Sequence, residues 1–274
     1  DFDWTRNNAS LSFNWDDQQT SKAFMFKNDP AGSGGNPQLK PMHSVNYDVS
    51  LEWYFSPGGS ITLSAFDKKI NNYIYTASAT KYIENPYNNN ATMAFDYTTY
   101  VNGDKGGVSG WELAYQQFYD MLPGFWGGFG IEANYTKIYN WGGHNGAVDT
   151  GSALAIAFAN DKSLPMEGMS HDSYNLALLY AKYNIDARLA WNWRSAYLSS
   201  SSDANAKQPS WIENYGQLDA SIFYTLLDHY KVGVQATNIT GANFYTDIGT
   251  TSYHPRLNSI KTDRKFSVVL RANW

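Results

Sequence analysis

The chain has 274 residues, of which 16% are charged and 16% are aromatic, and it contains no cysteine. So many aromatic residues argue against a disordered chain, and the lack of cysteine excludes a disulfide scaffold and a cysteine-based zinc site. No uninterrupted apolar run approaches the roughly 20 residues that a membrane-spanning helix needs. A net charge of −5 disfavours nucleic acid as a partner. The composition therefore favours an all-β chain with a large aromatic surface.

From residue 44 onward, apolar and polar residues alternate with the period of a β-strand. In the first segment, Val45, Val49 and Trp53 fall on one face, and Asn46 and Glu52 fall on the other. The same pattern predicts nine strands, although in the second the alternation is lost after Phe66. The nine lie at about 44–55, 61–65, 111–116, 129–136, 173–180, 188–194, 217–224, 231–237 and 265–274.

Short and long connections alternate between these strands. The short ones are Ser56–Ser60, Met121–Gly127, Tyr183–Asp186 and Leu226–Tyr230. The long ones are polar stretches at about 78–96, 140–171, 197–213 and 240–262. Short turns on one rim and long loops on the other are typical of an up-and-down outer-membrane barrel. The segment Asn102–Gly107, which is rich in glycine, is expected to form a bend or bulge within a long strand.

A soluble β-sandwich would give the same alternation, because its apolar faces look inward. Two further features favour the membrane: aromatic residues gather towards strand ends, and ionisable residues lie mid-strand on the polar face, as a wet lumen permits. These ionisable residues are Glu52, Glu112, Glu132, Arg188, Arg194, Asp219 and Arg271.

Nine strands leave two open edges, which lipid does not tolerate. Either a strand has been missed in residues 1–40, for which Ser10–Trp15 is the candidate, or the chain is the C-terminal part of a larger barrel. We favour the second interpretation. It makes residues 1–40 an extracellular loop region with a possible partial strand, and residues 41–274 the C-terminal barrel strands with long extracellular loops.

Aromatic residues in or beside the long loops are the first candidates for ligand binding, because flat rings beside amides and carboxylates suit sugar faces or an aromatic siderophore. The same rings could instead pack the loops together or form the outer girdle. The candidates of this kind are Trp141, Trp211, Tyr215 and Tyr245, with Tyr197, Phe244 and Tyr253 nearby. Lumenal Arg188 and Arg194 could contact an anionic solute or pair with carboxylates of a plug.

Catalytic and metal sites have little support. His171 beside Asp172 is the most suggestive acid–base pair, but nothing positions a second partner, and His144 with Asp149 lacks metal-ligand spacing. Calcium could take oxygens from Asp16 with Asp17 or from Asp203 with Asn205. We expect no resident metal, no cofactor and no enzymatic activity.

Several segments resemble, in order, the C-terminal half of a TonB-dependent outer-membrane receptor, particularly the branch common in sugar-scavenging bacteria. They are GNPQLKPMHSVNYDVSLEWYF (35–55), FDKKINNY (66–73), NGDKGGVSGWELAYQQF (102–118), SHDSYNLALL (170–179), WRSAY (193–197), QLDAS (217–221), TNIT (237–240) and RKFSVVLRANW (264–274). The closing strand departs from the family pattern at Asp263, Val269 and Ala272.

The resemblance implies the last nine strands of a barrel of about 22 strands in the outer membrane of a Gram-negative bacterium. It implies that Phe266, Val268, Leu270 and Trp274 form a membrane-insertion signal. The implied partners are a small solute, the lipid bilayer, the remaining strands, an N-terminal plug absent from this chain, and the TonB energy-coupling protein. The expected function is energy-coupled uptake of an oligosaccharide or a siderophore-like solute. The alternatives are a soluble carbohydrate-binding β-sandwich and a small ten-stranded barrel enzyme.

Overall fold

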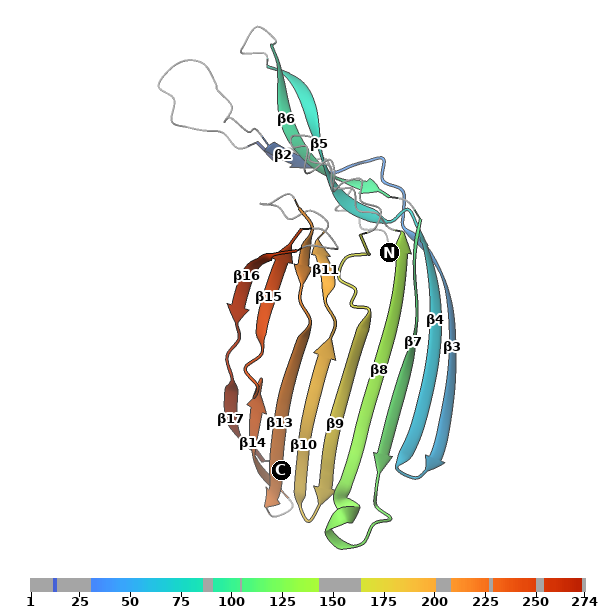
Figure 1. The fold of residues 1–274 in the computed structure, drawn as a ribbon, viewed down its shortest axis with the longest axis vertical. Coiled ribbons are helices and arrows are strands. Elements are labelled where there is room, and N and C mark those ends of the chain that lie inside the picture. The colour runs from blue at the N-terminus through green and yellow to red at the C-terminus, as the bar shows by residue number, and fades with distance from the viewer. Residues whose placement is uncertain are drawn as a thin grey trace.

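The computed structural model describes residues 12–13, 31–85, 91–103, 105–142, 164–200, 208–226, 229–249 and 254–272. Nine long strands form one antiparallel sheet in which each strand pairs with the one before it in this series (Figure 1). They are β3 (His43–Ser56), β4 (Gly59–Asn71), β7 (Gly106–Phe118), β8 (Phe129–Gly142), β9 (Asp172–Lys182), β10 (Ile185–Arg194), β13 (Tyr215–Leu226), β14 (Tyr230–Thr237) and β17 (Lys265–Ala272). The nine predicted strands and their up-and-down order are confirmed. The sheet is an unclosed arc with β3 and β17 at its edges.

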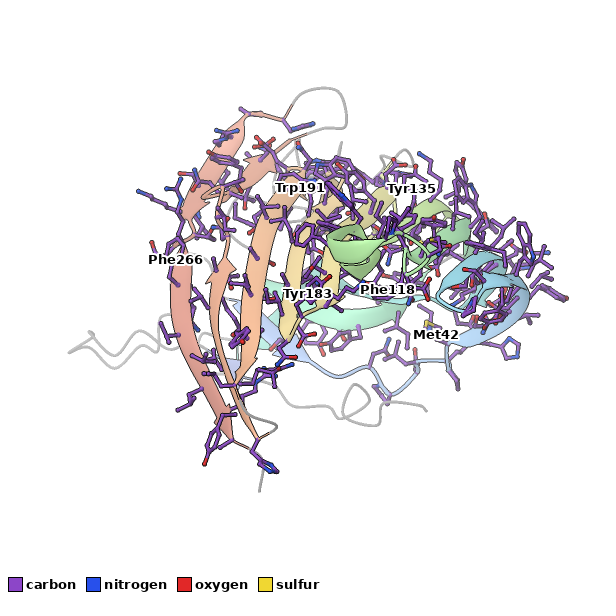
Figure 2. The ribbon with its side chains drawn as sticks, turned by 90° about the horizontal axis from the view of Figure 1, so that it is seen from below. Met42, Phe118, Tyr135, Tyr183, Trp191 and Phe266 are labelled. Carbon is purple, nitrogen blue, oxygen red and sulfur yellow. The ribbon has the colours of Figure 1, made fainter. Side chains whose placement is uncertain are left out.

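The apolar face of this sheet is bare. Val49, Leu51 and Val268 retain 73%, 69% and 81% of their accessible surface. Tyr135 and Trp191 lie on the convex side of the curved sheet, opposite Phe118 (Figure 2). Among the described residues, the contacts between elements follow the strand ladders, apart from those of the short helical turn at Gly124–Gly128 with β9, and no second sheet packs over the apolar face. A sandwich would bury that face, so the sandwich alternative is wrong for this fold.

Short turns join the strands at the lower rim in Figure 1. The β9–β10 hairpin has a two-residue turn, in which Tyr183 and Asn184 have φ of 55° and 60°. Positive φ at both central residues is the requirement of a type I′ turn, whose twist matches that of the flanking strands. The β7–β8 turn is longer and contains the 3₁₀-helix η2 (Gly124–Gly128). Within the described ranges, no helix has both the length and the apolar character needed to cross a bilayer.

The long upper connections and the region before β3 contain further strands, of which the sequence indicated only a possible partial strand at Ser10–Trp15. One sheet has the order β1–β2–β6–β5, and the other has the order β11–β12–β15–β16. Their bounds are β1 (Ser12–Phe13), β2 (Ala31–Gly34), β5 (Ile74–Asn85), β6 (Ala91–Asn102), β11 (Tyr197–Ser200), β12 (Ser210–Ile212), β15 (Asn243–Ile248) and β16 (Arg256–Lys261). The expectation of polar loops was incomplete because most of these strands are short or have no apolar face, so they lack the alternation by which the nine long strands were predicted. Ser12–Phe13 pairs with β2, so it adds no strand to the nine-stranded sheet.

Two local expectations are corrected. Strand β4 runs on past Phe66 to Asn71 without a break in register, and Asp67 and Lys69 occupy outward positions there. Above the apolar band the outward-facing residues of β4 become polar, although the strand and its pairing continue. The segment Asn102–Gly107 is not a bulge within one strand, because β6 ends at Asn102 and β7 begins at Gly106.

Candidate functional site: the lumenal face and the upper sheet

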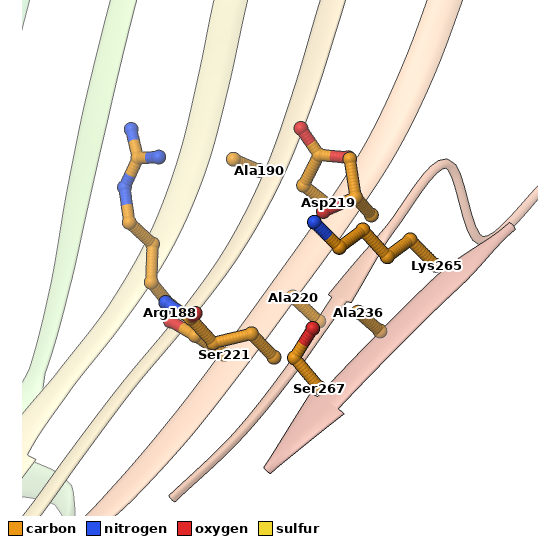
Figure 3. Close-up of a pocket in the computed structure, with 10 residues that line it drawn as sticks. Arg188, Ala190, Asp219, Ala220, Ser221, Ala236, Lys265 and Ser267 are labelled. Atoms are coloured by element: carbon orange, nitrogen blue, oxygen red, sulfur yellow. The ribbon is translucent and has the colours of Figure 1, made fainter. Parts of the chain in front are cut away.

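The polar face of β10, β13, β14 and β17 lines a cavity of about 240 Å³ (Figure 3). Strand pairing brings these residues together: Arg188 lies opposite Ser221, Ser221 opposite Gln235, and Gln235 opposite Ser267. The lining residues are Arg188, Ala190, Asp219, Ala220, Ser221, Gln235, Ala236, Thr237, Lys265 and Ser267. Two cations, one carboxylate and several hydrogen-bonding groups therefore face the same open space.

Arg188 is the predicted site residue that lies in this cavity. Its Nη2 atom is 3.5 Å from Oε2 of Glu132, and both side chains are half exposed. A single exposed contact of this length contributes little stability, about 0–1 kcal/mol. Arg188 therefore keeps donors for an anionic or hydroxylated partner.

A chain of hydrogen bonds connects Tyr215 to the cavity. The Tyr215 hydroxyl donates to Oε1 of Gln217 at 2.7 Å, and Nε2 of Gln217 donates to Oδ1 of Asp219 at 2.8 Å. The backbone N–H of Asn238 also donates to Oδ1 of Asp219, at 2.9 Å. These donors fix the Asp219 carboxylate at the cavity wall. The Tyr215 ring lies 5.5 Å from that of Phe244, so Tyr215 has both a packed face and a polar tip.

Trp211 on β12 and Tyr245 on β15 belong to the sheet β11–β12–β15–β16, which we call the upper sheet. Each ring stacks against a charged or ionisable side chain. The Trp211 ring stacks on His254 at 5.7 Å, and its Nε1 atom donates to the Gly249 carbonyl at 3.0 Å. Nδ1 of His254 lies 3.0 Å from Oδ2 of Asp247. Asp247 is only 4% exposed, and its Oδ1 atom has no hydrogen-bond partner among the described residues.

Arg256 stacks over the Tyr245 ring, with its guanidinium carbon 3.8 Å from the ring centroid. It also donates from Nη2 to Oε1 of Glu213. This hydrogen bond raises the pKa of the Arg256 guanidinium above its usual range, so the group stays charged. The upper sheet thus carries rings and fixed charges side by side, which suits a solute with flat faces and polar edges.

Arg194 lies above the cavity, and its side chain contacts other residues of this chain. Its Nε atom donates to Oγ of Ser170 at 2.8 Å, its Nη2 atom donates to the Gly168 carbonyl at 3.3 Å, and its guanidinium lies 4.0 Å from the Tyr197 ring. These contacts hold the segment 164–170 against β10 and β11, and Met166 of the segment and Leu198 of β11 are both buried. Pairing of Arg194 with a plug or a solute stays a prediction.

Trp141 lies away from the cavity. It is on the outward face of β8, half exposed, and its indole covers Gly107 of β7, so closely that a Cβ on that glycine would lie 2.5 Å from Nε1. Trp111 and Tyr135, with ring centroids 5.2 Å apart, share this outward face. The placement fits the girdle alternative for this residue.

Three residues of the predicted insertion signal, Phe266, Val268 and Leu270, are exposed on the outward face of β17. Trp274 lies outside the described residues, so the signal stays a prediction.

The suggested catalytic pair is not assembled. The Asp172 carboxylate accepts hydrogen bonds from Lys137 at 2.7 Å and from the Tyr135 hydroxyl, while His171 contacts the Ile138 carbonyl at 3.0 Å. The part of the chain that the structure describes contains no cluster of three metal-ligating side chains. The other candidate ligands and the last loop aromatic lie outside it: Asp16, Asp17, His144, Asp149, Asp203, Asn205 and Tyr253.

The cavity residues other than Arg188 were missed as a site. The available signal was the alternation, which placed Asp219 on the polar face and also puts Gln235 and Lys265 there. What the alternation does not reveal is register: Thr237 and Lys265 are far apart in sequence and directly opposed in the sheet.

Residues 3–239 match the family model described as "TonB dependent receptor-like, beta-barrel". No curated protein gives a significant match. Solved structures with a similar fold include the ferric enterobactin receptor of Pseudomonas aeruginosa in complex with enterobactin, with 15% identity over 89% of this chain and 33% of that one, and a TM-score of 0.58. The ferric yersiniabactin uptake receptor FyuA from Yersinia pestis has 12% identity over 96% of this chain and 33% of that one, with a TM-score of 0.53. The FrpB iron transporter from Neisseria meningitidis has 12% identity over 86% of this chain and 31% of that one, with a TM-score of 0.51. The chain spans about one third of these structures.

Proposed function

Because the chain belongs to the family of TonB-dependent receptor-like β-barrels, we propose that it forms the C-terminal wall of an outer-membrane receptor that takes up a scarce solute. What supports the proposal is one curved sheet with two different faces: an exposed apolar face and an inner face that carries a charged cavity. Such a sheet is stable only with lipid on one side and water on the other. Extraction of the intact protein from cells without detergent would contradict the proposal.

The remaining barrel strands are expected to pair with the edges β3 and β17, since lipid excludes unpaired backbone. An N-terminal plug would fill the lumen and connect it to the TonB protein. Arg188 and Lys265 are then available to carboxylates of the plug or to the solute. These partners would be present in the intact receptor, and we propose them because the chain belongs to the family.

The solute is proposed to be either a siderophore-like compound or an oligosaccharide. The three similar structures described above are two siderophore receptors and an iron transporter, which favours the first class. The resemblance of the sequence to the sugar-scavenging branch favours the second. The rings of Trp211 and Tyr245 with Asp247 and Arg256 suit both, because both present flat faces and oxygen atoms.

The test is direct binding to the intact receptor. Ferric catecholates, ferric hydroxamates and linear and branched oligosaccharides are titrated against the purified protein in detergent. Trp211→Ala and Tyr245→Ala are each expected to weaken binding of the true solute by about tenfold, the loss of one stacking contact of roughly 1–1.5 kcal/mol. Trp141→Ala is the matched control, because this ring faces outward. Equal weakening by all three variants would contradict the assignment of the site to the upper sheet.

A further inference from the structure

The turn between β7 and β8 exposes several large apolar side chains. Met121, Phe125 and Trp126 retain 64%, 51% and 61% of their accessible surface, and Leu122 is also exposed. We call these four residues the aromatic turn. Exposure of these apolar side chains to water would be unfavourable. What covers them depends on where the turn lies.

The aromatic turn folds against the outward face of the sheet. The Phe125 ring lies 4.9 Å from that of Tyr180 and 5.4 Å from that of Phe129, and the Trp126 ring lies 5.7 Å from that of Phe129. Phe129 and Tyr180 are directly paired across β8 and β9, two residues from Ile131 and Leu178 on the same apolar face.

Two contacts fix the turn in this place. Nζ of Lys182, also on the outward face, donates to the Gly124 carbonyl at 2.7 Å. Gly128 lies so close to β9 that an added Cβ would be 2.7 Å from the Tyr180 ring and equally close to the Lys182 Cβ. A side chain at this position would push the turn away from β9. Glycine here therefore favours the packing of the turn against the outward face of the sheet.

We propose that the aromatic turn is a lipid anchor whose rings sit among the headgroups of the periplasmic leaflet. The inference rests on the proposed membrane location. The turn is continuous with the apolar outward face, and it lies at the rim of short turns, where Tyr224 and Tyr230 are also exposed on the outward face. Tryptophan and other aromatic rings favour this interfacial layer, and Lys182 beside them suits lipid phosphates. The occupant is therefore phospholipid rather than a periplasmic protein.

The test uses the full-length receptor in cells, with the photocrosslinking residue p-benzoylphenylalanine introduced at position 126 or, as a second variant, at position 125. Val49, an outward-facing residue in the middle of β3, is the positive control, and Phe118, on the opposite face, is the negative control. Folding of each variant is checked by heat-dependent gel mobility, and adducts are identified by mass spectrometry. We expect phospholipid adducts at 126 and 125 at least tenfold above the yield at 118.

Each outcome is informative. Lipid adducts at 49 together with protein adducts, or no adducts, at 126 and 125 would overturn the lipid anchor while leaving the membrane location intact. Absence of lipid adducts at 49 as well would overturn the proposed function from which the inference starts.

Discussion

Substitution of the buried Asn238 is expected to destabilise the folded barrel more than substitution of an exposed asparagine does. Asn238 is 3% exposed, has φ of 56°, and joins β14 to β15. Its Oδ1 atom accepts the Ala242 N–H at 2.8 Å, and its Nδ2 atom donates to Oγ1 of Thr262 at 3.0 Å and lies 3.3 Å from the Thr262 carbonyl. The side chain therefore holds both β14–β15 and the start of β17 at one point.

In Asn238→Ala, two buried hydrogen bonds are lost and their partners are left unsatisfied, at roughly 1–3 kcal/mol each. A left-handed alanine adds about 1 kcal/mol. We expect the free energy of unfolding to fall by about 3–7 kcal/mol, a factor of at least one hundred in the unfolding equilibrium. Asn238→Gly removes the same bonds without the φ penalty, so it should be the less damaging by up to about 1 kcal/mol.

The assay is urea unfolding of the full-length receptor in lipid bilayers, followed by the gel mobility of the folded barrel. Asn72→Ala is the matched control, because Asn72 also has φ of 56° but its side chain makes one hydrogen bond, to the Pro41 carbonyl at 3.1 Å. Its loss should be about 1–2 kcal/mol. Equal losses for Asn72→Ala and Asn238→Ala would refute the role assigned to the buried amide.

Three further substitutions follow from the same structure. Gly233→Val should destabilise the sheet by about 1–3 kcal/mol, because a Cβ there would lie 2.3 Å from the Phe223 ring, and Phe223→Ala should partly rescue it in thermal unfolding; no rescue would mean that the clash is not with this ring. Asp172→Asn should lower stability by about 1–2 kcal/mol by leaving Lys137, 26% exposed, without its carboxylate, and the added change Lys137→Met should recover part of this loss in the same assay; an additive double variant would contradict the coupling. Arg194→Ala should free the segment 164–170, measured as faster proteolysis there with an intact barrel core, and unchanged cleavage would show that Arg194 does not fasten it.

The nine strands were predictable because a sheet between lipid and water must alternate in polarity, as Val45 to Phe55 do. The upper sheets could not be predicted in this way, because β5 and β12 lie beyond the apolar band and show no such alternation. The polar face was visible in the sequence, yet the cavity was not, because it depends on register between β13, β14 and β17. The role of Asn238 depends on contacts with Thr262, 24 residues away, which no local motif encodes.

The chain leaves the hydrogen-bond ladder of the nine-stranded sheet and enters that of the sheet β11–β12–β15–β16, or returns from it, at four gaps: 195–196, 213–214, 238–242 and 262–264. The covalent chain continues across each of these gaps, but no strand ladder does. Asn238, with its bonds to Ala242 and Thr262, is one of the groups that bridge them. The gaps are therefore hinges, about which the upper hairpins can bend while the barrel strands below remain paired.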